Sequence, residues 1–83
     1  MYLAKIYVTL KPTVNDPQGQ TVLGGLQTLG FASVDKVRMG KYLEVTLQEG
    51  RRGEAEARVK EMCHKLLANP VIEEYRFDLE EIG

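Results

Sequence analysis

Cys63 and His64 are the only cysteine and the only histidine of the sequence, and they are adjacent. A thiolate nucleophile needs a neighbouring base and an exposed, electropositive setting. Neighbouring residues of a helix diverge and do not face each other. Cys63 falls on the apolar stripe of a predicted helix and His64 at its edge, so we interpret the pair as a core thiol beside a surface histidine. Without other soft ligands, a zinc or iron–sulfur site is not expected either.

The C-terminal segment is acidic and raises the question of a hard metal site. Its carboxylates are Glu73, Glu74, Asp78, Glu80 and Glu81. Metal binding through Glu80-Glu81 is conceivable, but a solvated edge strand explains the same charges, and charged edges discourage strand-to-strand aggregation. We therefore predict no metal site here.

Two glycine-bearing stretches could suggest a phosphate site. Neither Gly19-x4-Gly24-Gly25 nor residues 48–53 matches a P-loop or a dinucleotide fingerprint, because the order of strand, glycines and helix is wrong. Arg51 and Arg52 could hold an anion, but a flexible basic loop explains them more simply. No catalytic residue is expected in this chain.

The composition predicts a single domain over residues 1–83. Eleven basic and 12 acidic residues give a formal net charge of −1, without the basic footprint of a nucleic-acid partner. No apolar run approaches membrane-spanning length, and the N-terminus has no signal-peptide pattern. A single unpaired cysteine fits a reducing compartment, so we expect a cytoplasmic protein with no membrane partner. A core this small usually gains stability from oligomerisation.

The first elements that must position a site are a strand and a helix. Alternating apolar residues predict a half-buried strand over residues 2–10. Asp16 suits the N-cap of the following helix, and Pro17 suits its first position. Gly30 can take the left-handed C′ position of a Schellman ending, with Phe31 after it.

Glycines inside this first helix are its unusual feature. Gly19, Gly24 and Gly25 each destabilise a helix interior by about 1 kcal/mol relative to alanine. Missing side chains let another backbone approach closely. For Gly24-Gly25 we favour the sheet beneath the helix as the approaching group, with a second polypeptide as the alternative.

The rest of the chain predicts two strands, a helix and a last strand. Residues 34–39 suggest a strand with imperfect alternation, and Gly40-Lys41 suits a type II′ turn into a strand over residues 42–47. The apolar stripe of residues 55–67 predicts a helix, and a final strand runs from about residue 72 to 79. The order β-α-β-β-α-β predicts an α+β, ferredoxin-like sandwich, with a four-stranded antiparallel sheet and two helices on one face.

The same topology hosts the RNA-recognition module, which stacks bases on aromatic side chains of central strands. Tyr7 and Tyr42 could imitate such platforms. The stretch from Gly40 to Val45 lacks the module's signature, however, and the surface is not basic. RNA binding is not expected.

Three stretches carry a more specific signal. They are Asp16-Pro17-Gln18-Gly19, Val37-Arg38-Met39-Gly40-Lys41, and the segment LLANPVIEEY of residues 66–75. In this order and at these distances they resemble PurS, the small subunit of phosphoribosylformylglycinamidine synthase. The resemblance covers essentially the whole chain. Asn15 departs from it, because many members carry an aliphatic residue at this position.

The resemblance implies the fourth step of de novo purine biosynthesis, in which formylglycinamide ribonucleotide, ATP and glutamine give formylglycinamidine ribonucleotide, ADP, phosphate and glutamate. It implies two partners, a large PurL-like synthetase subunit and a PurQ-like glutaminase subunit that has the catalytic cysteine. This chain would form a homodimer or a higher oligomer and join the other two as a non-catalytic ligase subunit. It would bind no cofactor itself, although the complex uses ATP, magnesium and glutamine.

Motif matching with this family gives a set of candidate interface residues. They are Lys11, Asp16, Pro17, Gln18, Gly19, Arg38, Gly40 and Lys41. Helix capping alone would explain Asp16 and Pro17, and a hairpin turn would explain Gly40. Lys11, Arg38 and Lys41 are the stronger candidates, because neither a turn nor a strand end requires their charge.

Two readings from other classes stay open. An acylphosphatase-like enzyme would need an arginine and an asparagine to bind phosphate and water, but Asn15 and Asn69, the only asparagines, have capping or turn roles. A small-molecule-sensing regulatory domain would share this topology. A ligand-induced rise in the melting temperature of the isolated chain would favour a sensor over an adaptor.

Overall fold

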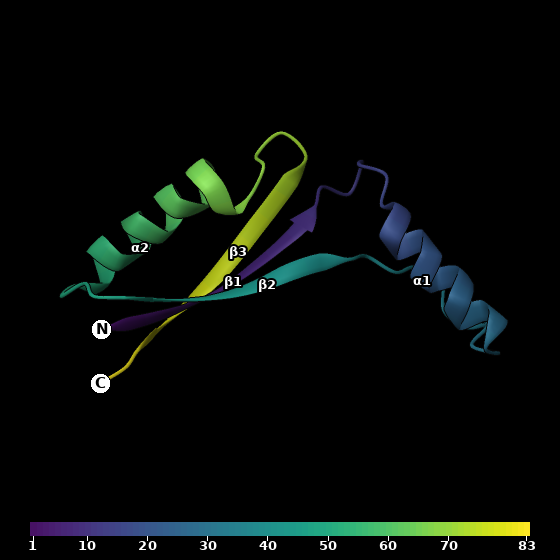
Figure 1. Ribbon diagram of the computed structural model, residues 1–83, viewed down its shortest axis with the longest axis horizontal. Helices are drawn as coiled ribbons and strands as arrows, with labels where there is room; N and C mark the ends of the chain where they lie inside the picture. Colours follow the sequence, from purple (N-terminus) through teal and green to yellow (C-terminus); the bar gives the residue numbers. More distant parts are fainter.

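The computed structural model describes all of residues 1–83, and its elements follow the order β-α-β-α-β. They are strand β1 (Tyr2–Leu10), helix α1 (Pro17–Thr28), strand β2 (Gly40–Leu47), helix α2 (Arg52–Met62), its π-helical continuation η1 (Cys63–Leu67) and strand β3 (Glu73–Glu81). The strands form one antiparallel sheet in the order β2-β1-β3 (Figure 1). Both outer strands therefore keep a free edge.

The core lies between one face of this sheet and α2. Ile6 of β1 pairs with Leu43 of β2 and Phe77 of β3, and alternation places every second residue of β1 on the same face. α2 packs on that face through side chains at helical spacing. The buried core residues are Tyr2, Ala4, Ile6, Val8, Leu47, Ala55, Val59, Cys63, Ala68 and Leu79. The predicted first strand, second helix and last strand are thus confirmed.

The second helix widens at its end before it stops. The Ala68 N–H donates to the Cys63 carbonyl at 3.0 Å, which is the i→i+5 pattern of a π-helix. The wider turn places Leu67 against the core and leaves Leu66 81% exposed. The predicted apolar stripe therefore loses one member to the surface.

The predicted four-stranded sheet is wrong. Residues 34–39 form no strand, and Gly40-Lys41 is the beginning of β2 rather than a hairpin turn. The polar groups of this segment have other partners: the Met39 N–H donates to the Asp16 carboxylate, and the Arg38 side chain donates to carbonyls near the end of β1. These bonds hold the segment beside the β1–α1 connection, so the sheet has three strands.

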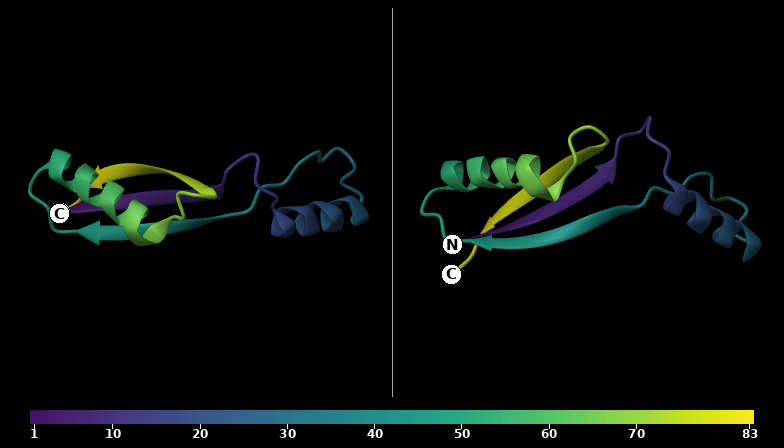
Figure 2. Two further views of the ribbon diagram at one scale, coloured as in Figure 1. Left: turned by 90° about the horizontal axis from the view of Figure 1, so that it is seen from above. Right: turned by 45° about the horizontal axis from the view of Figure 1, so that its top comes forward.

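The prediction of two helices on one face is also wrong. α2 covers the sheet, whereas α1 projects from the end of the sheet and covers neither face (Figures 1 and 2). Gly19 is the only buried residue of α1. A Cβ added to Gly24 or Gly25 would meet nothing within 4 Å, so the sheet is not the group that approaches these glycines.

Both predicted ends of α1 are confirmed. Asp16 caps the N-terminus and Pro17 occupies the first turn. At the other end Gly30 has φ 98°, the Phe31 N–H donates to the Leu26 carbonyl at 3.0 Å, and the Gly30 N–H donates to the Gln27 carbonyl at 3.1 Å. These two bonds define a Schellman ending.

The projecting helix makes the chain elongated, with extents of 50 × 29 × 14 Å. The radius of gyration is 16.3 Å, against about 12 Å for a compact domain of this length. Neither helix has the length and apolar composition needed to traverse a lipid bilayer.

Candidate functional site

The eight candidate interface residues meet at one place, which we call the junction: residues 10–19 and 37–41, where the end of β1, the start of α1 and the start of β2 come together. They arrive there from two separate stretches of sequence. Hydrogen bonds between the stretches, rather than apolar packing, hold the junction together.

Asp16 is the most buried polar side chain of the junction, at 5% exposure. One carboxylate oxygen, Oδ1, accepts the Gly19 N–H at 2.9 Å, and the other, Oδ2, accepts the Met39 N–H at 2.8 Å. The bonds from Met39 and Gly19 lower the pKa of Asp16 below its usual value, and the charge of Arg38 acts in the same direction. Asp16 therefore caps α1 and also ties it to the segment before β2.

Arg38 ties the same segment to β1. Its Nη2 donates to the carbonyls of Leu10 at 3.0 Å and Lys11 at 2.9 Å, and its Nη1 donates to the Val14 carbonyl at 3.3 Å. Arg38 therefore has a role within the chain that the sequence did not predict, and its contact with a partner stays a prediction. Sequence reasoning missed this role because the acceptors are backbone carbonyls more than 20 residues away.

Gly19 and Gly40 allow the close approaches that the junction requires. A Cβ on Gly19 would collide with the Val37 carbonyl oxygen and the Asp16 carboxylate. A Cβ on Gly40 would collide with the Val8 carbonyl oxygen and the Thr9 methyl group. Gly40 is thus fixed by strand packing and not by the predicted turn.

The remaining candidates present side chains outward. Gln18 and Lys41 line a hollow of about 260 Å³ together with Thr9 and Glu73. The Lys11 and Lys41 ammonium groups form no ion pair with the rest of the chain. Pro17 is exposed in the first turn of α1. These side chains are available to a partner, whereas Asp16, Gly19 and Arg38 act within the chain.

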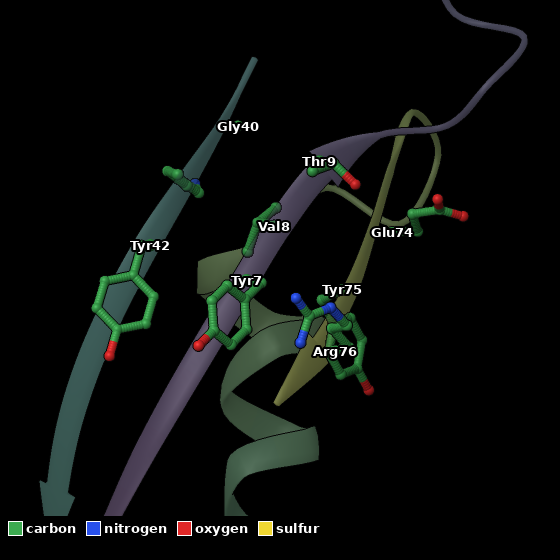
Figure 3. Close-up of a pocket in the computed structure, with 9 residues that line it drawn as sticks. Tyr7, Val8, Thr9, Gly40, Tyr42, Glu74, Tyr75 and Arg76 are labelled. Atoms are coloured by element: carbon green, nitrogen blue, oxygen red, sulfur yellow. The ribbon is translucent and has the colours of Figure 1, made fainter. Parts of the chain in front are cut away.

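A second hollow continues from the first on the sheet face that lacks a helix. Figure 3 shows Tyr7 of β1 between Tyr42 of β2 and Arg76 of β3. The tyrosine rings are 5.0 Å apart, and the Arg76 guanidinium lies 4.0 Å from the Tyr7 ring centre. Both hollows are lined by Thr9 and Gly40, so they meet there. Alternation along the strands places Arg76 on the same sheet face as Tyr7, and the strand register sets it directly beside Tyr7.

Tyr42, Tyr7 and Arg76 form a row across this sheet face. At one end of the row, the Tyr42 hydroxyl donates a hydrogen bond to Glu44 that is 2.8 Å long. The bond and the nearby carboxylate raise the pKa of Tyr42 to about 12. The hydroxyl stays protonated and donating at neutral pH. Tyr42 therefore contributes a hydrogen-bonding hydroxyl to this sheet face and does not act as an ionised base.

The groups with nucleophilic or metal-binding chemistry are not arranged for either task. Cys63 is completely buried, and burial raises the pKa of its thiol. His64 is exposed and lies edge-on to the Tyr75 ring, with centroids 5.9 Å apart. No three His, Cys, Asp or Glu side chains are grouped to hold a metal ion.

The fold and the junction define a class: a small α+β domain, in which a polar junction joins a projecting helix to a three-stranded sheet. Comparison with known proteins narrows the class. Residues 3–81 match the PurS family of phosphoribosylformylglycinamidine (FGAM) synthase. The chain belongs to this family, and it is therefore a subunit of FGAM synthase, a glutamine-dependent ligase of purine biosynthesis.

Individual relatives agree over their full lengths. The PurS subunit of Bacillus subtilis is 49% identical over 99% of this chain and 96% of its own sequence. The solved B. subtilis PurS structure has a TM-score of 0.89 and covers 98% of this chain and 100% of that one. Methanocaldococcus jannaschii PurS, 38% identical, also has a TM-score of 0.89 with complete coverage of both chains. The three-stranded fold is that of the family.

One similar structure comes from an assembly. A chain of the Thermotoga maritima PurLQS structure is 30% identical to this chain, with a TM-score of 0.85 over 96% of this chain and 99% of that one. The recognition of the family from its three sequence stretches is confirmed.

Proposed function

We propose that this chain is the assembly subunit of its FGAM synthase. It joins a PurL-like synthetase subunit to a PurQ-like glutaminase subunit, so that ammonia released from glutamine is used in the ATP-dependent conversion of formylglycinamide ribonucleotide to formylglycinamidine ribonucleotide. The complex uses ATP, magnesium and glutamine, and this chain binds none of them. It acts in the cytoplasm, as a pathway of soluble nucleotides requires.

The observation that carries the proposal is the likeness, over 96% of the chain, to a chain of the T. maritima PurLQS structure. Cys63 is completely buried, so the proposal assigns it no part in the release of ammonia. Ammonia is protonated and lost if it escapes to water, so tight and aligned subunits contribute to the rate without supplying an acid or a base.

The exposed surface supports an obligate contact with another polypeptide. The chain exposes 5892 Å², whereas a compact monomer of 9.4 kDa exposes about 5,000 Å². The excess of roughly 900 Å² is close to the ~800 Å² that each partner buries in a standard interface. One interface of ordinary size would therefore bury about as much surface as this chain exposes in excess of a compact monomer.

We propose a second copy as that partner, bound through α1. The far end of the helix exposes apolar side chains, with Leu29 74% and Phe31 54% exposed. Beside β2, an apolar hollow is lined by Val45, Met62 and Leu67, and Leu66 stands at its rim. A two-fold axis that places each α1 in the partner's hollow covers both patches at once. Each sheet would then carry two helices, as the sequence predicted for a single chain.

Serine substitutions test this dimer. Leu29→Ser and Leu66→Ser each remove an apolar side chain worth about 1.5–3 kcal/mol when buried, and each change occurs twice per dimer. We expect at least tenfold weaker dimerisation by sedimentation. Val71→Ser, at a side chain that is 76% exposed on another loop, is the matched control. Equal dimerisation of all three variants would contradict this interface.

We propose that the outward side chains of the junction contact the larger subunits. Lys11, Gln18 and Lys41 are the residues concerned, because Gln18 and Lys41 line one hollow and neither lysine forms an internal ion pair. Charge-neutral variants of the two lysines should weaken assembly with one larger subunit while the dimer persists. Unchanged assembly would remove the junction from the interface.

The function is tested with purified cognate subunits. ADP formation from formylglycinamide ribonucleotide is measured with glutamine, and separately with ammonium chloride, each with and without this chain. We expect glutamine-dependent turnover to require the chain and ammonium-dependent turnover to proceed largely without it. If neither rate changes, the assembly role is wrong and a sensing function becomes the better account.

A further inference from the structure

Apolar packing holds α1 only weakly, because Leu23 and Leu26 are half-buried and its other apolar side chains are exposed. Gly19 is its only buried residue, and the helix extends away from the sheet (Figure 2). Helices in globular proteins are usually held by an apolar stripe against a core. In this chain, Val22 and Leu29 of this helical segment are exposed, so hydrogen bonds at the junction supply much of what fixes its orientation.

Two charged side chains supply the links. Asp16 connects the first turn of α1, at Gly19, to the segment before β2, at Met39. Arg38 connects that segment to the end of β1, at Leu10, and to the connection before α1, at Val14. Three stretches of chain are therefore tied by five hydrogen bonds from two residues. Gly19 adds a steric condition, since only a residue without a Cβ lets α1 approach Val37 this closely.

The residue types suit this task and are hard to replace. An ionised carboxylate has two acceptor oxygens, whereas an asparagine has one acceptor and one amino group. Asparagine at position 16 would therefore present a donor to one of the two N–H groups. The planar guanidinium of Arg38 offers several donors in a fixed fork, and a lysine ammonium does not reproduce that geometry.

We propose that Asp16 and Arg38 form a clamp that fixes the direction of α1 and, through it, the alignment of the assembled synthase. This inference rests on the proposed assembly function and deepens it. The 12 residues of α1 make a lever about 18 Å long. A change of about 10° at the clamp moves its tip by about 3 Å, and errors of ~1 Å in alignment already slow reactions between positioned groups. Asp16 and Arg38 are positioning residues, because they act on the reaction through the helix that they hold.

The test uses the reconstituted three-subunit enzyme with Asp16→Asn and Arg38→Lys chains. Asp35→Asn and Lys36→Gln are matched controls, because both residues are exposed on the same connection and form no ion pair. Each chain is added to saturation, so that a lower affinity or folded fraction does not limit the rate. We expect glutamine-dependent turnover to fall at least fivefold for the clamp variants, ammonium-dependent turnover to stay within twofold of wild type, and the controls to match wild type in both.

A second readout reports the clamp directly. Amide hydrogen exchange at Gly19 or Met39 should accelerate at least tenfold in Asp16→Asn, while amides in β1 keep their protection. Faster exchange with an unchanged ratio of the two turnover rates would overturn the positioning role, and unchanged exchange would overturn the clamp itself. If the wild-type chain fails to raise glutamine-dependent turnover, the assembly function fails instead. The two failures are therefore distinguishable.

Discussion

Alanine at two glycines of α1 should change the stability of the chain in opposite directions. Gly24 lies in the exposed middle of the helix, where an added Cβ meets nothing within 4 Å. Alanine is favoured there by about 0.8–1.0 kcal/mol through helix propensity alone. For a domain of this size, such a gain raises the melting temperature by roughly 4–8 °C. Gly25→Ala should behave in the same way.

Gly19→Ala introduces the same methyl group at the clamp. The new Cβ meets the Val37 carbonyl oxygen and the Asp16 carboxylate, so the first turn of α1 must move away. That movement breaks the charge-assisted bond from the Gly19 N–H, which is worth about 1.5–3 kcal/mol. The propensity gain offsets up to about 1 kcal/mol of this loss. We expect a net destabilisation of about 1–2 kcal/mol and a correspondingly lower melting temperature.

Thermal unfolding followed by circular dichroism checks this pair at several chain concentrations, because dimerisation makes the melting temperature concentration-dependent. The same unfolding experiments at different concentrations report whether a second chain packs against Gly24 in the dimer. Equal stabilisation by both substitutions would refute the close approach at Gly19. Destabilisation by Gly24→Ala that grows with concentration would show that a second polypeptide approaches this part of α1.

Three further predictions concern ionisable groups. Since hydrogen bonds lower the pKa of Asp16 in the folded chain, its stabilising contribution is complete above about pH 4 and is lost as the pH falls through the folded value. The gap in melting temperature between wild type and Asp16→Asn should therefore narrow from pH 6 to pH 3, and a constant gap would contradict this. Glu44→Gln should lower the pKa of Tyr42 from about 12 toward its usual 10 in an ultraviolet titration. The same pKa in both chains would show that this hydrogen bond does not raise it. Because Cys63 is fully buried, thiol reagents should modify it only in parallel with unfolding in urea, and rapid labelling of the native chain would disprove that burial.

The elements that sequence reasoning predicted correctly are those with local signals. Strict alternation marks β1, the Asp16 cap and the Gly30 ending mark α1, and an apolar stripe marks α2. Each signal involves residues within one or two turns of each other.

The fourth strand and the placement of α1 were predicted wrongly for long-range reasons. The hydrogen bonds that recruit Arg38 and Met39 link residues 23 to 28 positions apart, and no local pattern announces them. An apolar stripe on a helix shows that something covers it, but not whether the cover belongs to the same chain. The ferredoxin-like prediction assumed the same chain for α1.

The structure brings the candidate residues together at the junction, and their contact with a partner stays a prediction. Motif matching selected residues that meet at the junction, including Asp16, Gly19 and Arg38. It assigned Arg38 to a partner, whereas the structure gives its guanidinium three backbone carbonyls of its own chain. The contact between Arg76 and Tyr7 was not predicted, because it depends on the strand order and register.

The central claim is that this chain couples the release of ammonia from glutamine to its use by the synthetase. Isotope competition tests it most directly: the complete complex is supplied with glutamine labelled with ¹⁵N at the amide and with an excess of unlabelled ammonium in solution. With this chain present, we predict that most of the formylglycinamidine ribonucleotide carries ¹⁵N. Without this chain, most of the product should carry unlabelled nitrogen from the dissolved ammonium. Equal dilution of the label with and without the chain would contradict the account.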